Sequence, residues 1–232
     1  MTALLSARAL SARRGDRLLF SGLELDLQAG EVVWLRGTNG RGKTTLLRLL
    51  AGLATPERGE VRFESLPLRQ AGAAWREHLA YVAHSNALKD DLSAAQALAF
   101  LAGLRGRPVP PEAVDAALAR LGVQRQARLP VRALSQGQRR RVALARLALS
   151  EPPRVWLLDE PFDALDEGGI ETLAALLREH AARGGTALLT SHQALPTGLA
   201  SRTLDLDALG GAARGTGTEA RAGTNPATGA QA

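Results

Sequence analysis

The 232-residue sequence contains no cysteine, few aromatic residues and no long hydrophobic run. The lack of cysteine excludes disulfide scaffolds, thiolate metal sites and cysteine nucleophiles. Aromatic residues make up 3% of the chain, too few for the base-stacking surface of an RNA-binding sheet. The longest nearly apolar run, residues 97–104, is far shorter than the roughly 20 residues that a membrane helix needs. Residues 1–10 lack the charged-then-apolar order of a signal peptide, so we expect the chain to stay where it is made.

The composition is otherwise that of an ordinary globular protein, with 45% hydrophobic and 22% charged residues. The length fits one sizeable core, or one core with a small inserted lobe. The net charge of +6 fits an arginine-rich soluble protein, or one that meets phosphates or an anionic membrane face. Residues 210–232 have no aliphatic side chain larger than alanine except Pro226, which predicts a disordered tail.

Short apolar segments alternate with helical patterns along the chain. Strands are predicted at residues 4–10, 18–27, 31–36, 60–63, 155–158 and 186–190. Helices are predicted at residues 44–53, 92–104, 111–121, 135–149 and 170–183. The order is strand, loop and helix, then a helical insert at about residues 75–150, then strand, helix and strand. This order predicts an α/β fold with a parallel sheet.

A glycine-rich loop between an apolar strand and an apolar helix matches the phosphate-binding pattern G-x-x-x-x-G-K-[ST]. Its glycines let backbone N–H groups surround a phosphate, and Lys43 adds a positive charge at the β- and γ-phosphates. The Thr44 hydroxyl is placed to bind Mg²⁺. A chance glycine-rich turn is the alternative, which the flanking strand and helix disfavour. The predicted ATP site comprises Gly37, Thr38, Asn39, Gly40, Arg41, Gly42, Lys43, Thr44 and Thr45.

Two adjacent carboxylates, Asp159 and Glu160, follow the buried strand 155–158. Ligands of parallel sheets bind beyond the carboxyl ends of the strands. We therefore expect Asp159 to bind the Mg²⁺ and Glu160 to face the attacking water. A solvated strand end with two acids is the simpler alternative.

Two further segments become candidate parts of the ATP site because of their position relative to these motifs. Ser135 begins a helix whose first turn carries arginines at residues 139–141, and three cations there oppose the helix dipole unless anions lie nearby. Taken alone, the segment is more simply explained as an ordinary serine cap beside solvent-exposed arginines. His192 follows strand 186–190, where a lone histidine is usually structural. After a phosphate loop and an acid pair, it becomes a candidate contact for the γ-phosphate.

Together these motifs resemble the ATP-binding subunit of ABC transporters, from about residue 4 to residue 206. Residues 37–44 resemble Walker A, and residues 155–160 resemble Walker B with its catalytic glutamate. Residues 134–138, LSQGQ, are similar to the LSGGQ signature, with glutamine in place of the first glycine. Residues 164–166 resemble the D-loop, and His192 the switch histidine.

The resemblance implies a P-loop NTPase core within residues 1–209, with a small N-terminal antiparallel β part and an inserted helical subdomain. It implies that two copies pair head to tail around two ATP molecules. Ser135 and Gly137 of one copy then meet the γ-phosphate bound by the other, and Lys43, Glu160 and His192 are catalytic. The family works with integral membrane subunits at the cytoplasmic face of the cell membrane, as a peripheral protein, and no nucleic acid is expected.

Two positions depart from the family pattern. Arg14 lies in the segment where the family usually has an aromatic residue under adenine, so its guanidinium is a candidate to stack on the base. His84 stands where the family usually has a glutamine near the Mg²⁺ and the membrane subunit. An imidazole changes charge near neutral pH, so coupling through His84 would depend on pH.

Among ABC transporter subunits, three segments and one residue point to a particular subfamily. They are residues 44–53, 141–147 and 157–166, and His84. They are similar to the haem-exporter ATP-binding subunit of bacterial cytochrome c maturation. A subunit of another ABC transporter, for lipids, drugs or ions, is the nearest alternative. A non-transport ABC ATPase acting on ribosomes or DNA is a further one, which the single cassette and the lack of a heptad run disfavour.

Overall fold

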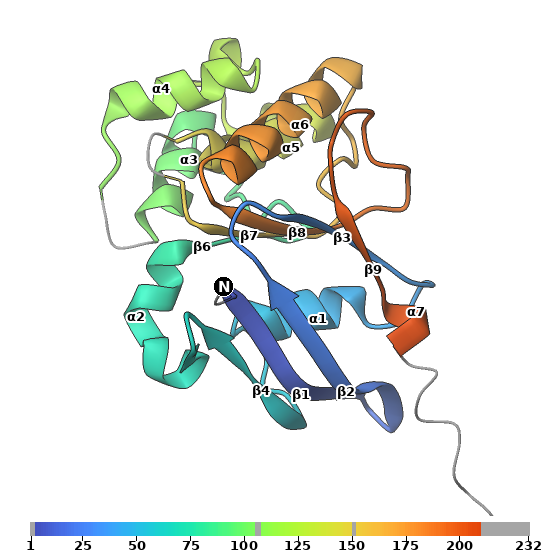
Figure 1. The fold of residues 1–232 in the computed structure, drawn as a ribbon. Coiled ribbons are helices and arrows are strands. Elements are labelled where there is room, and N and C mark those ends of the chain that lie inside the picture. The colour runs from blue at the N-terminus through green and yellow to red at the C-terminus, as the bar shows by residue number, and fades with distance from the viewer. Residues whose placement is uncertain (1–2, 105–107, 150–151, 210–232) are drawn as a thin grey trace, which may run out of the picture.

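The computed structural model describes residues 3–104, 108–149 and 152–209; the predicted disordered tail, residues 210–232, lies outside the described residues. Two β-sheets form the framework (Figure 1). The first sheet is antiparallel and has the strand order β2-β1-β4-β5. Its strands are β1 (Leu5–Arg14), β2 (Arg17–Leu27), β4 (Arg58–Phe63) and β5 (Leu66–Pro67). The expected N-terminal antiparallel part is therefore confirmed.

The second sheet has five strands in the order β6-β7-β8-β3-β9, and every neighbouring pair is parallel. Its strands are β3 (Val32–Arg36), β6 (Leu79–Val82), β7 (Val155–Leu158), β8 (Thr186–Thr190) and β9 (Arg202–Asp205). All five strands therefore end at the same edge of the sheet, which confirms the predicted α/β class with a parallel sheet.

Helices cover both faces of the parallel sheet (Figure 1). The α-helices are α1 (Lys43–Leu50), α2 (Leu68–His78), α3 (Ala94–Gly103), α4 (Pro111–Arg120), α5 (Gln136–Ala145), α6 (Glu167–Ala182) and α7 (Leu206–Leu209). The 3₁₀-helices are η1 (Gln124–Gln126), η2 (Val131–Ala133) and η3 (Arg146–Ala148). Helices α3, α4, α5 and α6 lie on one side of the sheet, and α1 and the antiparallel sheet lie on the other (Figure 1).

The parallel sheet separates two hydrophobic cores. Along β7, Trp156 and Leu158 belong to the core beneath α3–α6, whereas Val155 and Leu157 belong to the core shared with α1 and the antiparallel sheet. All four side chains are fully buried. A strand that is buried on both faces has a continuous apolar sequence, which is why the sequence alone predicted β7 with its observed limits.

Several elements were not predicted from the sequence, and β6, β9 and α2 show why. β6 has only four residues, and its pairing with β7 rather than any pattern of its own makes it a strand. β9 is a largely exposed edge strand beside β3. α2 is broken by a left-handed backbone at Gly72, so its apolar residues do not follow one helical period. The helix predicted at residues 135–149 ends at Ala145 and tightens into η3.

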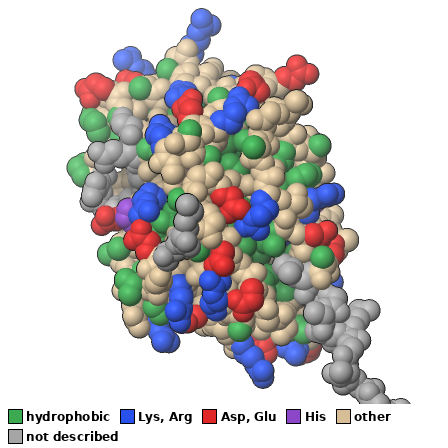
Figure 2. Space-filling model, in the orientation of Figure 1, with side chains coloured by type: hydrophobic (Ala, Val, Ile, Leu, Met, Phe, Trp, Pro, Cys, Tyr) green, Lys and Arg blue, Asp and Glu red, His purple; other side chains and the backbone are tan. Residues whose placement is uncertain are grey.

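No helix within the described ranges is long and apolar enough to cross a bilayer. Basic and acidic side chains are interspersed on the face drawn in Figure 2. The positive net charge is therefore not gathered into one basic stripe on that face.

Candidate active site

The phosphate loop connects β3 to α1 and leaves the first turn of that helix without a side-chain cap. Ser93, Ser135 and Asp166 cap α3, α5 and α6 with their side-chain oxygens, whereas Gly42, at the start of α1, provides none. The first backbone N–H groups of α1 are therefore open to an anion. Gly42 has φ of 108° and a Cβ there would lie 3.1 Å from the Leu19 Cβ, so the turn requires glycine.

The Lys43 ammonium group lies within this loop. Nζ donates to the carbonyl oxygen of Gly37 at 2.7 Å and to that of Thr38 at 3.5 Å, and the side chain is buried. A bound phosphate would offer the ammonium a charged partner in place of these neutral oxygens. The loop thus holds its cation at the site where the sequence predicts the β- and γ-phosphates.

Asp159 joins two elements that are far apart in the sequence. The Thr44 hydroxyl at the start of α1 donates to Asp159 Oδ2 at 2.7 Å, and the Thr190 hydroxyl at the end of β8 donates to Oδ1 at 2.8 Å. The Asp159 backbone N–H donates to the Val82 carbonyl oxygen at 2.8 Å. A carboxylate and a hydroxyl side by side are ligands that suit Mg²⁺, so Thr44 and Asp159 fit that ion.

Glu160 is buried and faces His192. Its Oε2 accepts the His192 backbone N–H at 3.0 Å, and Oε1 lies 3.3 Å from His192 Nε2. The Glu160 backbone has φ of 48°, a left-handed conformation that non-glycine residues rarely adopt. Its N–H donates to the Thr190 hydroxyl at 2.8 Å. The structure therefore brings together Glu160, Asp159 and His192 at the carboxyl ends of β7 and β8.

Arg140 of α5 is a buried cation behind Glu160 that the sequence analysis treated only as part of an arginine cluster. Its side chain is 3% exposed and donates to the carbonyl oxygens of Asp159 and Glu160 at 3.0 and 2.5 Å. Burial lowers the pKa of the guanidinium, while the charges of Asp163, Asp159 and Glu160 act in the opposite direction. A helical pattern signals this burial, because position 140 lies one turn before the buried Leu144 on α5.

Ser135 and Gly137 lie at the start of α5. Ser135 Oγ accepts the Gln138 backbone N–H at 3.2 Å, and Gln138 Oε1 accepts the Ser135 N–H at 3.0 Å, which completes a capping box. A Cβ on Gly137 would lie 2.8 Å from the Ala164 carbonyl oxygen. Within the part of the chain that the structure describes, no hydrogen bond or ion pair joins Ser135 or Gly137 to the phosphate loop.

Arg14 and His84 lie at the margins of this site. Arg14 is the last residue of β1, and Arg17, which begins β2, has Nη1 3.7 Å from the position of a Cβ on Gly40. His84 follows β6 and is mostly exposed, with Nδ1 3.8 Å from an Asp163 carboxylate oxygen. The proposed contacts of Arg14 with adenine and of His84 with the γ-phosphate region stay predictions.

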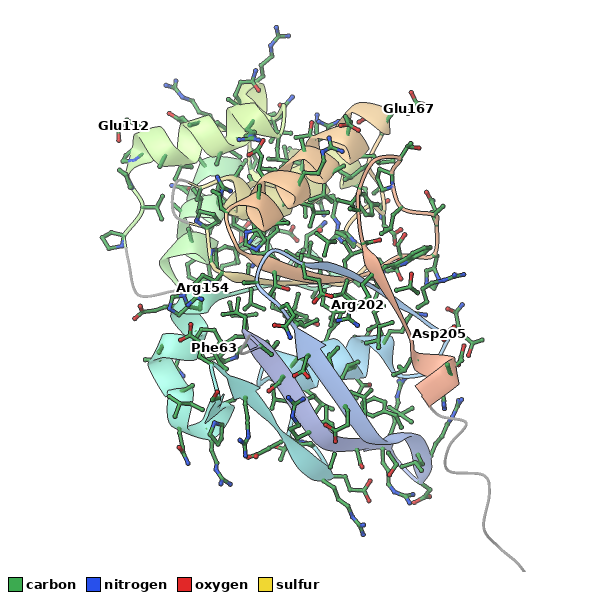
Figure 3. All side chains as sticks on the ribbon, viewed as in Figure 1. Phe63, Glu112, Arg154, Glu167, Arg202 and Asp205 are labelled. Carbon is green, nitrogen blue, oxygen red and sulfur yellow. The ribbon has the colours of Figure 1, made fainter. Side chains whose placement is uncertain are left out.

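Asp207 of α7 supports the phosphate loop from the side of β9, the edge where Figure 3 shows Asp205. Its Oδ2 accepts the Thr38 backbone N–H at 2.7 Å and its Oδ1 accepts the Thr38 hydroxyl at 3.1 Å. Arg41 Nε lies 3.2 Å from Oδ1. No pattern in the sequence pointed to Asp207, because only the pairing of β9 with β3 brings it to the loop.

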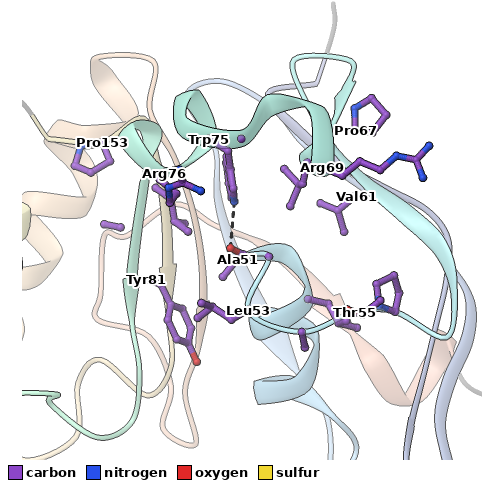
Figure 4. Close-up of a pocket in the computed structure, with 18 of the residues that line it drawn as sticks. Ala51, Leu53, Thr55, Val61, Pro67, Arg69, Trp75, Arg76, Tyr81 and Pro153 are labelled. Atoms are coloured by element: carbon purple, nitrogen blue, oxygen red, sulfur yellow. Dashed lines mark hydrogen bonds between the residues drawn. The ribbon is translucent and has the colours of Figure 1, made fainter. Parts of the chain in front are cut away.

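A groove of about 810 Å³ opens between the end of α1, α2 and the start of β6 (Figure 4). Most of its lining is apolar, and Leu53 and Leu104 on its rim are 57% and 65% exposed. At its floor the Trp75 indole N–H donates to the Ala51 carbonyl oxygen at 3.2 Å. Burial, and to a smaller extent the negative charge of Asp159, raises the pKa of the lining residue Tyr81.

Comparisons with known proteins agree with this geometry. A family model described as "ABC transporter" matches residues 20–163. The "Cytochrome c biogenesis ATP-binding export protein CcmA" of Methylococcus capsulatus is 46% identical over 202 residues, which cover 87% of this chain and 97% of that protein. The protein of the same name in Pseudomonas aeruginosa is 45% identical over 83% of this chain and 94% of its own.

Solved structures share the fold. A putative ABC transporter ATP-binding protein from Pyrococcus furiosus superposes with a TM-score of 0.75 at 25% identity, covering 88% of this chain and 98% of that one. A bacterial ABC transporter cassette, solved as a dimer, gives a TM-score of 0.71 at 25% identity over 82% and 88% of the two chains.

Proposed function

The chain belongs to the ABC transporter family, and from this premise we propose that it is the ATP-hydrolysing subunit of a transporter for cytochrome c biogenesis, with haem export as its role. The observation that carries the proposal is the joining of the phosphate loop, Asp159 and Glu160 at one edge of the sheet. The names of the relatives, at 43–46% identity, support the assignment to cytochrome c biogenesis.

In the proposed mechanism, the first N–H groups of α1 and the Lys43 ammonium bind the β- and γ-phosphates of ATP. Thr44 and Asp159 would hold Mg²⁺, and that ion would supply positive charge against the charge that develops on the phosphates. Glu160 orients a water molecule for in-line attack and accepts its proton. His192, beside Glu160, steadies the γ-phosphate.

The signature residues belong to a second copy of the chain in this proposal. Among the described residues, no hydrogen bond or ion pair joins Ser135 or Gly137 to the phosphate loop of their own chain, and a relative of 25% identity was solved as a dimer. Ser135→Arg is expected to abolish hydrolysis while ATP still binds. Mixing this variant with Lys43→Ala, each inactive alone, should restore at most one working site in each mixed dimer. Mixtures that stay inactive would contradict the head-to-tail arrangement.

The apolar groove fits the proposed membrane partner. Exposed leucines on its rim, Leu53 and Leu104, would bury their side chains under an apolar segment of an integral membrane subunit. Residues 79–81 of β6 line this groove, and the last residue of the strand, Val82, accepts the Asp159 backbone N–H, so β6 connects the proposed partner contact to the candidate active site. Such docking would keep the chain at the cytoplasmic face of the cell membrane as a peripheral subunit.

One variant tests both halves of the proposed function. Glu160→Gln should lower the turnover of ATP by roughly 100-fold or more, because an amide cannot accept the proton, while ATP binding persists. In cells that lack the native gene, the same variant should fail to restore c-type cytochromes, as measured by haem staining. Glu112→Gln, far from the site on α4, serves as the matched control (Figure 3). Normal turnover in Glu160→Gln, or restoration of c-type cytochromes by an inactive variant, would contradict the proposal.

A further inference from the structure

The Arg140 guanidinium is the junction of two loops at the active edge of the sheet. On one side it donates from Nη2 to the carbonyl oxygens of Asp159 and Glu160, and from Nε to that of Pro161 at 3.4 Å. On the other side it contacts the loop of residues 83–86, which follows β6. One buried side chain thus holds both loops.

The contacts with the loop of residues 83–86 all come from Nη1. It donates to the Ala83 carbonyl oxygen at 3.0 Å, to the Asn86 side-chain oxygen at 3.2 Å and, at the longer distance of 3.5 Å, to the His84 carbonyl oxygen. Each acceptor of Arg140 in the two loops is a neutral oxygen. A buried charge satisfied in this way fixes the positions of its partners, because a rearrangement would leave the cation without them.

The backbone at Glu160 needs such support. Three successive carbonyl oxygens, from Asp159 to Pro161, converge on one cation, although without it their dipoles would repel one another. The cation therefore stabilises the left-handed conformation of Glu160, whose φ is 48°. The Thr190 hydroxyl holds the N–H on the other side of the same residue. This conformation directs the Glu160 carboxylate to His192.

We propose that Arg140 is a positioning residue that couples the loop of residues 83–86 to the catalytic carboxylate of Glu160. The proposal rests on the proposed function, in which Glu160 activates the attacking water. A shift of the loop would be transmitted through the planar guanidinium to the Glu160 backbone. Because the loop follows β6, whose first residues line the apolar groove, an occupant of the groove would act on Glu160 through Arg140.

Steady-state kinetics of purified full-length variants tests this role. Arg140→Gln should lower kcat for ATP by about 100-fold, the cost of a misplaced catalytic group, with KM within about twofold of the original. Asn86→Ala removes one loop contact without touching Glu160 and should lower kcat by about fivefold. Combined with Arg140→Gln, it should add no further loss, because the two residues act through one connection.

Val142→Ala controls for loss of stability, since Val142 is buried in the same helix and belongs to the core beneath α3–α6. It should lower the melting temperature while kcat stays near that of the original protein. If Arg140→Gln does not fold, Asn86→Ala and Arg140→Lys carry the test. A kcat near the original in Asn86→Ala, or equal loss of kcat in Val142→Ala at equal stability, would overturn the proposal.

The test separates this inference from the proposed function. Reduced turnover in Glu160→Gln together with normal turnover in either Arg140→Gln or Asn86→Ala would overturn the role of Arg140 alone. Normal turnover in Glu160→Gln would instead remove the role of Glu160 on which the inference rests. In the Glu160→Gln background, Arg140→Gln should cause no further loss of turnover.

Discussion

The two ends of the parallel sheet both bury ionisable side chains, but they treat charge differently. At the carboxyl ends of the strands, Lys43, Asp159 and Glu160 are all less than 10% exposed, and the polar atoms of each side chain make hydrogen bonds within the site. At the amino ends, His180 is 3% exposed and stacks on Trp156, with ring centroids 3.8 Å apart. Burial there lowers the pKa of His180 to about 4.

The difference shows what keeps a charge inside a protein. His180 Nε2 lies 3.2 Å from the Thr186 carbonyl oxygen, a partner that only partly offsets the loss of water around the ring. No buried carboxylate among the described residues faces it, so the neutral imidazole is the stable form. The phosphate-loop end instead surrounds its charges with hydroxyls, backbone groups and opposite charges. One end is therefore suited to chemistry and the other to packing.

The tightest packing at the amino end is between Gly185 and the His180 ring. A Cβ on Gly185 would lie 2.1 Å from the ring, so Gly185→Ala forces the ring off Trp156. We expect this variant to lose about 3 kcal/mol of unfolding free energy, measured by urea denaturation. Gly103→Ala, where a Cβ meets nothing within 4 Å, is the control and should change stability little. An unchanged unfolding free energy in Gly185→Ala would mean that the His180 ring can move off Trp156 without cost.

The neutral state of His180 predicts a dependence of stability on pH. Because its pKa is 6.5 in the unfolded chain and about 4 in the folded one, the unfolded state binds more protons as the pH falls below 6.5. The stabilisation that the neutral His180 contributes is fully present above pH 6.5 and is lost as the pH falls from 6.5 to 4. At pH 5 the loss should be about 2 kcal/mol relative to pH 8. His180→Phe, which keeps a ring against Trp156, should remove this part of the pH dependence, and an unchanged profile would contradict it.

A smaller effect is expected at the phosphate-loop end, where Asp207 supports the loop from outside. Asp207→Ala removes its bonds to Thr38 and its ion pair with Arg41, and these groups are partly exposed. We expect a loss of about 1 kcal/mol in ATP binding, seen as a roughly fivefold rise in KM at constant kcat. Asp115→Ala on the exposed side of α4 is the control. A fall in kcat without a change in KM would place Asp207 in the chemistry instead.

The sequence alone determined the parts of the protein that depend on local order. The phosphate loop of residues 37–44 was evident because its glycines, Lys43 and Thr44 are adjacent along the chain. The adjacent acids Asp159 and Glu160 were evident because they directly follow β7, whose apolar residues mark a strand buried on both faces. The parallel sheet followed from the alternation of these strands with helices.

Only the tertiary structure decided which distant residues support these motifs. β6 and β9 have weak patterns of their own and exist through pairing with β7 and β3, so the positions of the 83–86 loop and of Asp207 could not be derived from spacing. The inward direction of Arg140 depends on six acceptors from two loops that are remote in sequence. A motif specifies reactive groups through neighbouring residues, whereas their orientation comes from contacts that form only when the chain has folded.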